Sequence, residues 1–132
     1  MYLVDTSAWL DYLKGNKGPV VIKLTEVMDQ HIPFGITGVI YQEILQGADT
    51  EDDFALLEEY FGTQRFYHPR DLMETYRNAA ALYVRCRRRG VTPRSTVDCF
   101  IAQVAIEHQL QLIHSDRDLT AMARVLPELK IA

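Results

Sequence analysis

Four acidic residues occupy positions that ordinary packing does not require, and together they could perform metal-dependent chemistry. Asp5 and Asp116 each follow a short apolar stretch typical of a buried strand. Asp98 lies in the first turn of an otherwise apolar helical segment, and Glu43 interrupts the apolar face of another. Because the ends of parallel strands and the starts of the following helices share one edge of a sheet, we expect these carboxylates to converge there.

Convergence of carboxylates needs a cation, because like charges a few ångströms apart raise one another's pKa. A divalent cation removes that penalty. The set contains only oxygen ligands and no matched Cys or His residues, which favours Mg²⁺ or Mn²⁺ over structural zinc. Such a site typically activates water for phosphoryl chemistry, so hydrolysis without a covalent intermediate is predicted. The alternative for Asp5 is that it only caps the first helix beside Thr6.

The composition indicates one globular domain, residues 1–132, with 48% hydrophobic and 24% charged residues. No apolar run is long enough for a membrane span, and the start lacks the features of a signal peptide. Cys86 and Cys99 lack metal-type spacing, which favours reduced thiols and a cytoplasmic location. The net charge of −4 argues against broad, salt-driven nucleic-acid binding but agrees with a cluster of metal-binding acids.

The chain alternates strand-like and helical segments, which predicts an α/β fold with a mainly parallel sheet of four or five strands between helix layers. Strands are expected over residues 2–4, 31–36, 64–68, 110–114 and 129–132. Pro33 places the second of these near a sheet edge, since it cannot donate to a ladder. Helices are expected over residues 6–13, 20–30, 39–46, 50–61, 71–89, from 95 onward, and after 116.

Two helices carry more specific expectations. Thr6 or Ser7 is the predicted N-cap of the first. The long helix over 71–89 is predicted to bury one apolar face, made of Leu72, Tyr76, Ala79, Ala80, Tyr83, Val84 and Cys86.

The basic residues concentrate in one short region, which contains Arg85, Arg87, Arg88, Arg89 and Arg94. A solvated helix end, where cations favour the helix dipole, explains two or three of them. Five arginines within ten residues also fit an edge that contacts phosphates. His114 is the one histidine expected near the acids, and no histidine has ligand spacing.

Four segments of the chain resemble the PIN-domain ribonucleases, in particular the toxins of bacterial VapBC-type toxin–antitoxin pairs. They are YLVDTSAWLDYL, ITGVIYQEILQGA around Glu43, STVDCFIAQVAIEHQL around Asp98, and LIHSDRDLTAMA around Asp116. The resemblance implies a PIN-like three-layer α/β/α sandwich and a ribonuclease, a hydrolase that needs Mg²⁺ or Mn²⁺.

Matched residue by residue, the resemblance assigns the metal site to Asp5, Glu43, Asp98 and Asp116. Thr6 and Ser115 would be supporting polar residues, and Asp118 stands where the family often has a further acid. Leu119 departs from the aromatic residue common at its position. The five arginines become candidates for RNA contacts.

The resemblance also implies partners: an RNA substrate, a second copy in a homodimer, and a VapB-type antitoxin whose tail masks the site. The exposed side of the early helices, near Trp9, Tyr12 and Leu13, could receive the antitoxin. The alternative for Trp9 is ordinary core packing.

Three other readings of the acids remain. A phosphatase with an aspartyl nucleophile would need a second acid two residues after Asp5, where Ser7 stands. A receiver-like signalling module would need a lysine beyond the last strand in the expected place, and none is evident. The third is a catalytically inactive PIN-like dimeric binding module, which would retain four clustered acids without using them.

Overall fold

A five-stranded parallel sheet forms the centre of the computed structural model, which describes residues 1–132. The strands are β1 (Tyr2–Val4), β2 (Phe34–Ile36), β3 (Arg65–Phe66), β4 (Gln111–Ile113) and β5 (Lys130–Ile131). Their order is β3-β2-β1-β4-β5, and every neighbouring pair is parallel. The predicted α/β class and parallel sheet are therefore confirmed.

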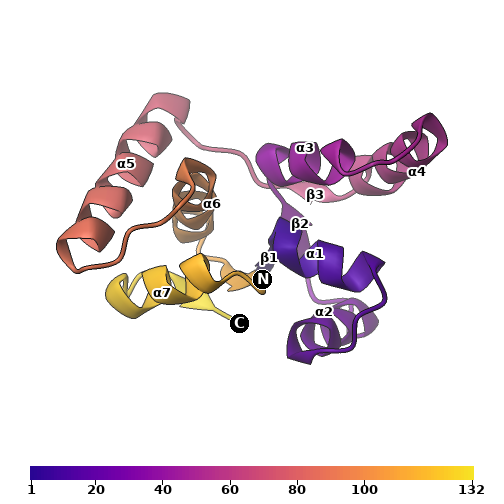
Figure 1. Cartoon of the computed structure of the whole chain (residues 1–132), viewed down its shortest axis with the longest axis horizontal. Helices are drawn as coiled ribbons and strands as arrows, with labels where there is room; N and C mark the ends of the chain where they lie inside the picture. The colour runs from indigo at the N-terminus through magenta and orange to yellow at the C-terminus, as the bar shows by residue number, and fades with distance from the viewer.

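Seven helices cover the two faces of this sheet. They are α1 (Thr6–Leu13), α2 (Pro19–Asp29), α3 (Gly38–Gln46), α4 (Glu51–Gly62), α5 (Leu72–Arg88), α6 (Thr96–Glu107) and α7 (Arg117–Val125). The chain moves outward from β1 to β2 and β3, then returns across β1 to β4 and β5. Right-handed connections place helices made before and after that reversal on opposite faces. Figure 1 shows α1–α4 on one side of the strands and α5–α7 on the other.

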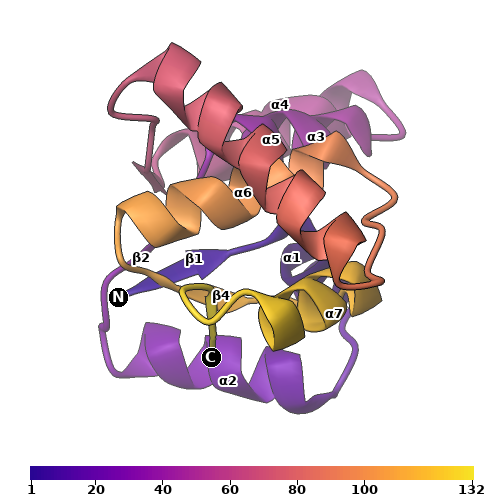
Figure 2. The same ribbon diagram turned by 90° about the vertical axis from the view of Figure 1, so that its left-hand side faces the viewer.

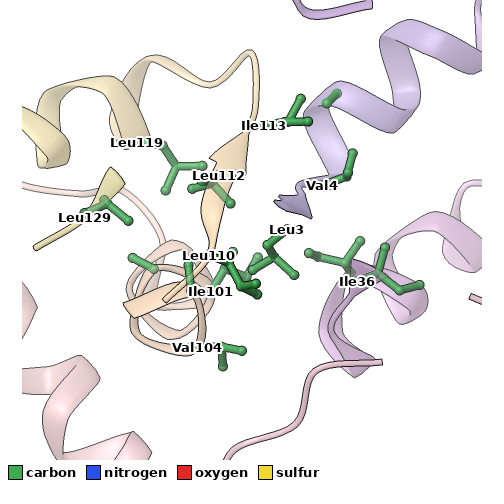
Figure 3. Close-up of a cluster of buried hydrophobic side chains, with 14 of the residues drawn as sticks. Leu3, Val4, Ile36, Ile101, Val104, Leu110, Leu112, Ile113, Leu119 and Leu129 are labelled. Carbon is green, nitrogen blue, oxygen red and sulfur yellow. The ribbon is translucent and has the colours of Figure 1, made fainter. Parts of the chain in front are cut away.

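The core lies on both faces of the central strands. Leu3 and Val4 of β1 and Leu112 of β4 are fully buried, as expected for short apolar strands covered on two sides. Helix α6 passes over one face and contributes Ile101 and Val104 (Figure 3). Seen from the side, α5 and α6 lie above the strands and α2 below them (Figure 2). None of the seven helices combines the length and apolar character needed to cross a membrane.

The N-cap of α1 is Asp5, so the prediction of Thr6 or Ser7 is wrong and the capping that the alternative gave to Asp5 is present. The Asp5 side chain accepts a hydrogen bond from the backbone N–H of Ser7. Strand β1 ends at Val4 and the helix begins at Thr6, so Asp5 occupies the N-cap position between them. The aspartate that could bind a cation therefore also starts the helix.

Strand β2 is internal, so its predicted place near the sheet edge is wrong. It pairs with β1 on one side and β3 on the other. Pro33 is tolerated because it precedes the strand, which begins at Phe34. The carbonyl of Pro33 accepts a hydrogen bond from the N–H of Tyr2. Because Pro33 lies outside β2, its missing N–H removes no hydrogen bond between the strands.

Helix α5 is rotated relative to the predicted apolar face. Its buried residues are Thr75, Ala79, Leu82 and Cys86, whereas Leu72 and Tyr76 are more than half exposed. Tyr76 instead lines an apolar groove of about 510 Å³ between α5, α6 and α3. The apolar residues of α5 thus divide between the core and this groove.

Trp9 is fully buried, which agrees with the core alternative for this residue. Its ring packs edge-on against Phe61 and Tyr12, with centroid separations of 4.9 and 5.9 Å. Of the three residues named for the expected antitoxin surface, Trp9 is buried, Tyr12 is partly buried and Leu13 is exposed. Both cysteines are buried and unpaired, as predicted.

Candidate metal centre

The acids gather where the order of the strands reverses direction along the chain. The chain passes from β1 to β2 on one side and reaches β4 on the other. In open α/β sheets, the ligand-binding crevice is the region beyond the carboxyl ends of the two strands at such a switch point, here β1 and β4. Asp5 stands at this point, and its N–H donates to the carbonyl of Ile113 at the end of β4 (2.9 Å). Asp116 follows β4 after two further residues and caps α7.

Asp5 is buried and is held by a single neighbour, Ser7. Oδ2 of Asp5 accepts hydrogen bonds from the backbone N–H (3.1 Å) and the hydroxyl (2.6 Å) of Ser7. Oδ1 accepts no hydrogen bond from the protein. The cap and a ligand role are therefore compatible, because the cap uses one oxygen and leaves the other.

Ser7 is a residue of the site that the sequence reasoning missed. Its hydroxyl donates to Asp5 and also accepts the backbone N–H of Ser115 (3.0 Å), so it joins the loops after β1 and β4. The hydroxyl of Ser115 donates to Asp11 on α1 (2.8 Å) and contacts none of the site acids. A serine two residues after a strand-ending aspartate was the available signal, and it was read only as a cap.

Glu43 is oriented from α1. Thr6, the first residue of that helix, donates its hydroxyl to Oε1 of Glu43 at 2.8 Å. Glu43 lies on α3, whose buried residues are Ile40 and Ile44, so the helix packs on the core with this carboxylate on its border. Oε2 accepts no hydrogen bond from the protein.

Three aspartates form the tightest acidic group. Asp98, Asp116 and Asp118 each offer a carboxylate oxygen, and these oxygens lie within 4.8 Å of one another. Ser95 is the N-cap of α6, so the Asp98 side chain is not needed for a capping hydrogen bond. Oδ1 of Asp116 accepts the N–H of Asp118 (2.7 Å), so the start of α7 fixes both residues.

Asp118 has an additional partner, Arg94, on the connection that leads into α6. Oδ2 of Asp118 accepts the Nε–H (3.0 Å) and the backbone N–H (3.2 Å) of Arg94. These hydrogen bonds hold the pKa of Asp118 below its usual range. Asp118 therefore remains ionised beside the other two aspartates.

Asp98 is the acid of this group whose pKa is raised. Burial and then the charges of neighbouring acids raise its pKa from 3.8 to about 7. The acids that act on it are Asp116, Asp5, Asp118 and Glu43, in decreasing order. Asp5 and Glu43 lie outside the tight group of three, yet their charges still reach Asp98.

The donor set fits a hard divalent cation. Asp5, Glu43, Asp116 and Asp118 each use one oxygen for a protein hydrogen bond and keep the other free, and Asp98 keeps both. Hydrogen bonds to one oxygen orient a carboxylate so that the second can coordinate a metal. Oxygen-only ligands suit Mg²⁺ or Mn²⁺.

His114 supports the loop and is not one of these donors. It is 8% exposed, and its Nδ1 accepts the backbone N–H of Asp116 at 3.0 Å. Burial lowers its pKa, which favours the neutral ring that this hydrogen bond requires.

The five arginines expected to form one basic edge have separate roles. Arg85 forms a bidentate pair with Glu128 (2.7 and 3.0 Å), and the guanidinium of Arg87 lies 5.8 Å from the centre of the Tyr83 ring. Arg88 and Arg89 are exposed at the end of α5. Arg94 alone contacts an acid of the candidate centre.

Comparison with known proteins identifies the family of the chain. The family profile described as PIN domain matches residues 2–125. The chain is 31% identical over 126 residues to VapC ribonuclease Mb1587 of Mycobacterium bovis, covering 95% of this chain and 93% of that protein. The same identity and coverage relate it to ribonuclease VapC11 of Mycobacterium tuberculosis.

Two solved structures share the fold. One is VapBC2 from Rickettsia felis bound to a DNA fragment of its promoter, with a TM-score of 0.72 and 13% identity. The other is FitAcB from Neisseria gonorrhoeae, with a TM-score of 0.68 and 15% identity. Each likeness covers 99% of this chain and 96% of the other. At these identities the structures support the fold alone.

A first prediction concerns Ser7. In Ser7→Ala, Asp5 loses its hydroxyl partner, so its free oxygen is less well oriented and Mn²⁺ affinity should fall by about tenfold or more. Isothermal titration of Mn²⁺ into the protein without RNA measures this. Ser115→Ala is the matched control, because its backbone N–H still reaches Ser7 and its hydroxyl serves only Asp11. Equal affinities in all three proteins would contradict the role of Ser7.

A second prediction concerns pH. The folded-state pKa of Asp98 (about 7) lies above the ordinary value of 3.8, so the folded chain holds this proton more tightly than the unfolded chain. Asp98 therefore contributes a loss of stability as pH rises towards 7, and the loss is complete above it. Asp98→Asn, which does not ionise, should lack this loss and be more stable than the parent at pH 8 without metal.

Thermal unfolding of both proteins in EDTA from pH 5 to pH 8 tests this. His114, whose pKa is lowered by burial, is present in both proteins, so the difference between their profiles isolates Asp98. Parallel profiles would mean that the neighbouring acids do not disfavour an ionised Asp98.

Proposed function

The chain belongs to the PIN-domain family, and from that premise we propose that it is a metal-dependent endoribonuclease and the toxin of a VapBC-type toxin–antitoxin pair. The relatives that share 31% identity across 95% of the chain are named as ribonucleases. The PIN-domain profile matches residues 2–125, a range that includes all five acids of the candidate centre.

One observation carries the metal-dependent part of this proposal. Asp98, Asp116 and Asp118 offer oxygens within 4.8 Å of one another, and the charges of Asp5 and Glu43 also act on Asp98. Each of these five acids keeps at least one oxygen free of protein hydrogen bonds. Burial and then the charges of the neighbouring acids raise the pKa of Asp98 to about 7, so ionisation of Asp98 is opposed while no cation is bound. A bound divalent cation relieves that opposition, and carboxylate oxygens are the ligands it prefers.

The protein's own residues have separable tasks in this proposal. Asp98 and Asp116, with Asp5 across the crevice, hold Mg²⁺ or Mn²⁺, and Asp118 is a further ligand candidate. Glu43, oriented by Thr6, either completes the ligand set or orients the attacking water. When bound, the cation lowers the pKa of water and stabilises charge on the phosphodiester, which permits hydrolysis without a protein nucleophile.

The proposed antitoxin surface lies on α1 and α4. Residues 47–64, which include α4, contain six acidic and no basic side chains. Along α4, Phe54, Leu56 and Tyr60 are exposed, and on α1 Leu10 and Leu13 are exposed. Apolar side chains left uncovered on neighbouring helices are typical of a protein-binding surface. The two structural neighbours are described as VapBC2 and FitAcB, and we extend the toxin–antitoxin arrangement to this chain as part of the proposal.

A homodimer is the third component of the proposal. The apolar groove between α5 and α6 has nine hydrophobic residues among its ten lining residues, and Leu72, Met73 and Tyr76 stand exposed along the same helix. A second copy packed on this groove would cover that surface. Because Thr96 and Val97 line the groove two residues or fewer from Asp98, the same contact would bring two candidate centres near one interface.

The cleavage prediction compares the parent chain with Asp5→Asn on total cellular RNA and on defined single-stranded substrates. Cleavage should require Mg²⁺ or Mn²⁺, stop in EDTA, and fall by at least about a hundredfold in the variant, because asparagine keeps the shape but removes the ligand charge. The cap survives in the variant because an amide oxygen also accepts hydrogen bonds. Unfolding temperature should accordingly change little.

Failure to cleave any RNA by the folded, metal-loaded parent chain would favour the inactive PIN-like binding module instead. Cleavage that persists in Asp5→Asn would leave the chain a ribonuclease and restrict Asp5 to its capping role. The two results separate the family's activity from this assignment of the site.

The dimer prediction uses Ala80→Arg, which places a charge in the groove at an exposed helix position. Arginine is a good helix former, so α5 should persist. Light scattering after size exclusion should give the mass of two copies for the parent chain and one for the variant. Asn78→Arg adds the same charge to α5 outside the groove and should remain dimeric. A monomeric parent chain would refute the dimer.

A further inference from the structure

Arg94 is held against the candidate metal centre by two hydrogen bonds to one atom. Its Nε–H and its backbone N–H both donate to Oδ2 of Asp118, at 3.0 and 3.2 Å. The backbone bond fixes the connection before α6, and the side-chain bond fixes the direction of the guanidinium. The residue is therefore attached at the border of the acidic crevice, which a freely moving surface arginine would not be.

The remaining part of the guanidinium is available. Neither Nη1 nor Nη2 of Arg94 donates to a protein acceptor, and the side chain is 72% exposed. Arg85 offers the contrast, since both of its terminal nitrogens are occupied by Glu128. A guanidinium with one edge bound to a carboxylate and the other free can still bind a phosphate oxygen through that free edge.

The crevice needs such a cation if it receives a nucleic acid. Asp5, Glu43, Asp98, Asp116 and Asp118 would repel a phosphate backbone, and a metal cation at the centre offsets this only at the phosphate that it contacts. The phosphates on either side remain exposed to the acids. Arg94 lies within electrostatic reach of Asp98 and Asp116 as well as Asp118.

We propose that Arg94, oriented by Asp118, binds an RNA phosphate beside the one that is cleaved and thereby positions the strand over the acids. This rests on the proposed ribonuclease function and distinguishes Arg94 from the other four arginines of its region. Arg94 is a positioning residue in this scheme, and Asp118 orients its guanidinium.

Arg117 provides a matched control. It begins α7 between Asp116 and Asp118, it is exposed, and its charge also acts on Asp118. No acidic side chain pairs with it, so it supplies a comparable positive charge without a fixed direction. A difference between Arg94→Ala and Arg117→Ala therefore reports orientation rather than charge alone.

The test measures KM and kcat for a single-stranded RNA over a range of salt concentrations in the parent chain, Arg94→Ala and Arg117→Ala. Arg94→Ala should raise KM about tenfold with a smaller change in kcat, since a bound flanking phosphate contributes equally before and during cleavage. The slope of log KM against log salt should fall by about 0.7, the value for one lost phosphate contact on a single strand. Arg117→Ala should leave KM within about twofold of the parent value.

Mn²⁺ titration without RNA supplies a readout independent of cleavage. Arg94→Ala should bind Mn²⁺ at least as tightly as the parent chain, because the substitution removes a nearby positive charge. Weaker Mn²⁺ binding with an unchanged salt slope would mean that Arg94 serves only to hold Asp118 for the metal, and would overturn the proposal.

Two further outcomes separate this inference from the function on which it rests. An active parent chain whose KM and salt slope are unchanged in Arg94→Ala, or changed equally in Arg117→Ala, overturns the role of Arg94 alone. A parent chain that neither binds Mn²⁺ nor cleaves RNA overturns the proposed function and this inference with it.

Discussion

A partly buried Asp98 beside the carboxylates of Asp116 and Asp118 constrains the rest of the molecule. Burial, and then the charges of the neighbouring acids, raise the pKa of Asp98 to about 7, so packing alone does not favour an ionised Asp98 at this place. The fold must therefore supply stability elsewhere. It does so with β1 and β4, whose apolar side chains are buried on both faces immediately before the chain reaches Asp5 and Asp116.

The same neighbouring residues that stabilise the loops also aim the acids. Asp5 and Asp116 cap α1 and α7, Thr6 reaches Glu43, and Ser7 joins the loops after the two central strands. Each acid in these contacts uses one carboxylate oxygen for a protein hydrogen bond and keeps the other oxygen free. Structural and functional demands are thus met by different atoms of one side chain, so the capping role of Asp5 does not compete with a ligand role.

Charge is distributed unevenly over the molecule. Many of the acids lie at the candidate metal centre or on helix α4. The arginines of the 85–94 region make a salt bridge with Glu128, an aromatic contact and a pair with Asp118, or are exposed without a partner. The net charge of −4 averages over surfaces with different partners in the proposed function. It therefore says little about whether one of those surfaces binds a nucleic acid.

The sequence by itself determined the features that contiguous residues encode. Apolar runs and helical periodicity predicted the elements and the α/β class, because these depend on neighbours along the chain. The positions of Asp5 and Asp116 after strands, of Asp98 at a helix start and of Glu43 on the apolar face of a helix indicated convergence for the same reason. The resemblance to PIN-domain ribonucleases rested on those segments too.

Tertiary structure alone decided what depends on strand order and helix rotation. It placed β2 inside the sheet, turned Leu72 and Tyr76 of α5 towards a groove, brought Asp118 into the tightest acidic group, and divided the arginines. Arg94 and Asp118 are 24 residues apart, and Thr6 and Glu43 are 37 apart. No local sequence pattern predicts such a pair, because the two residues come within hydrogen-bond distance only when the sheet has formed.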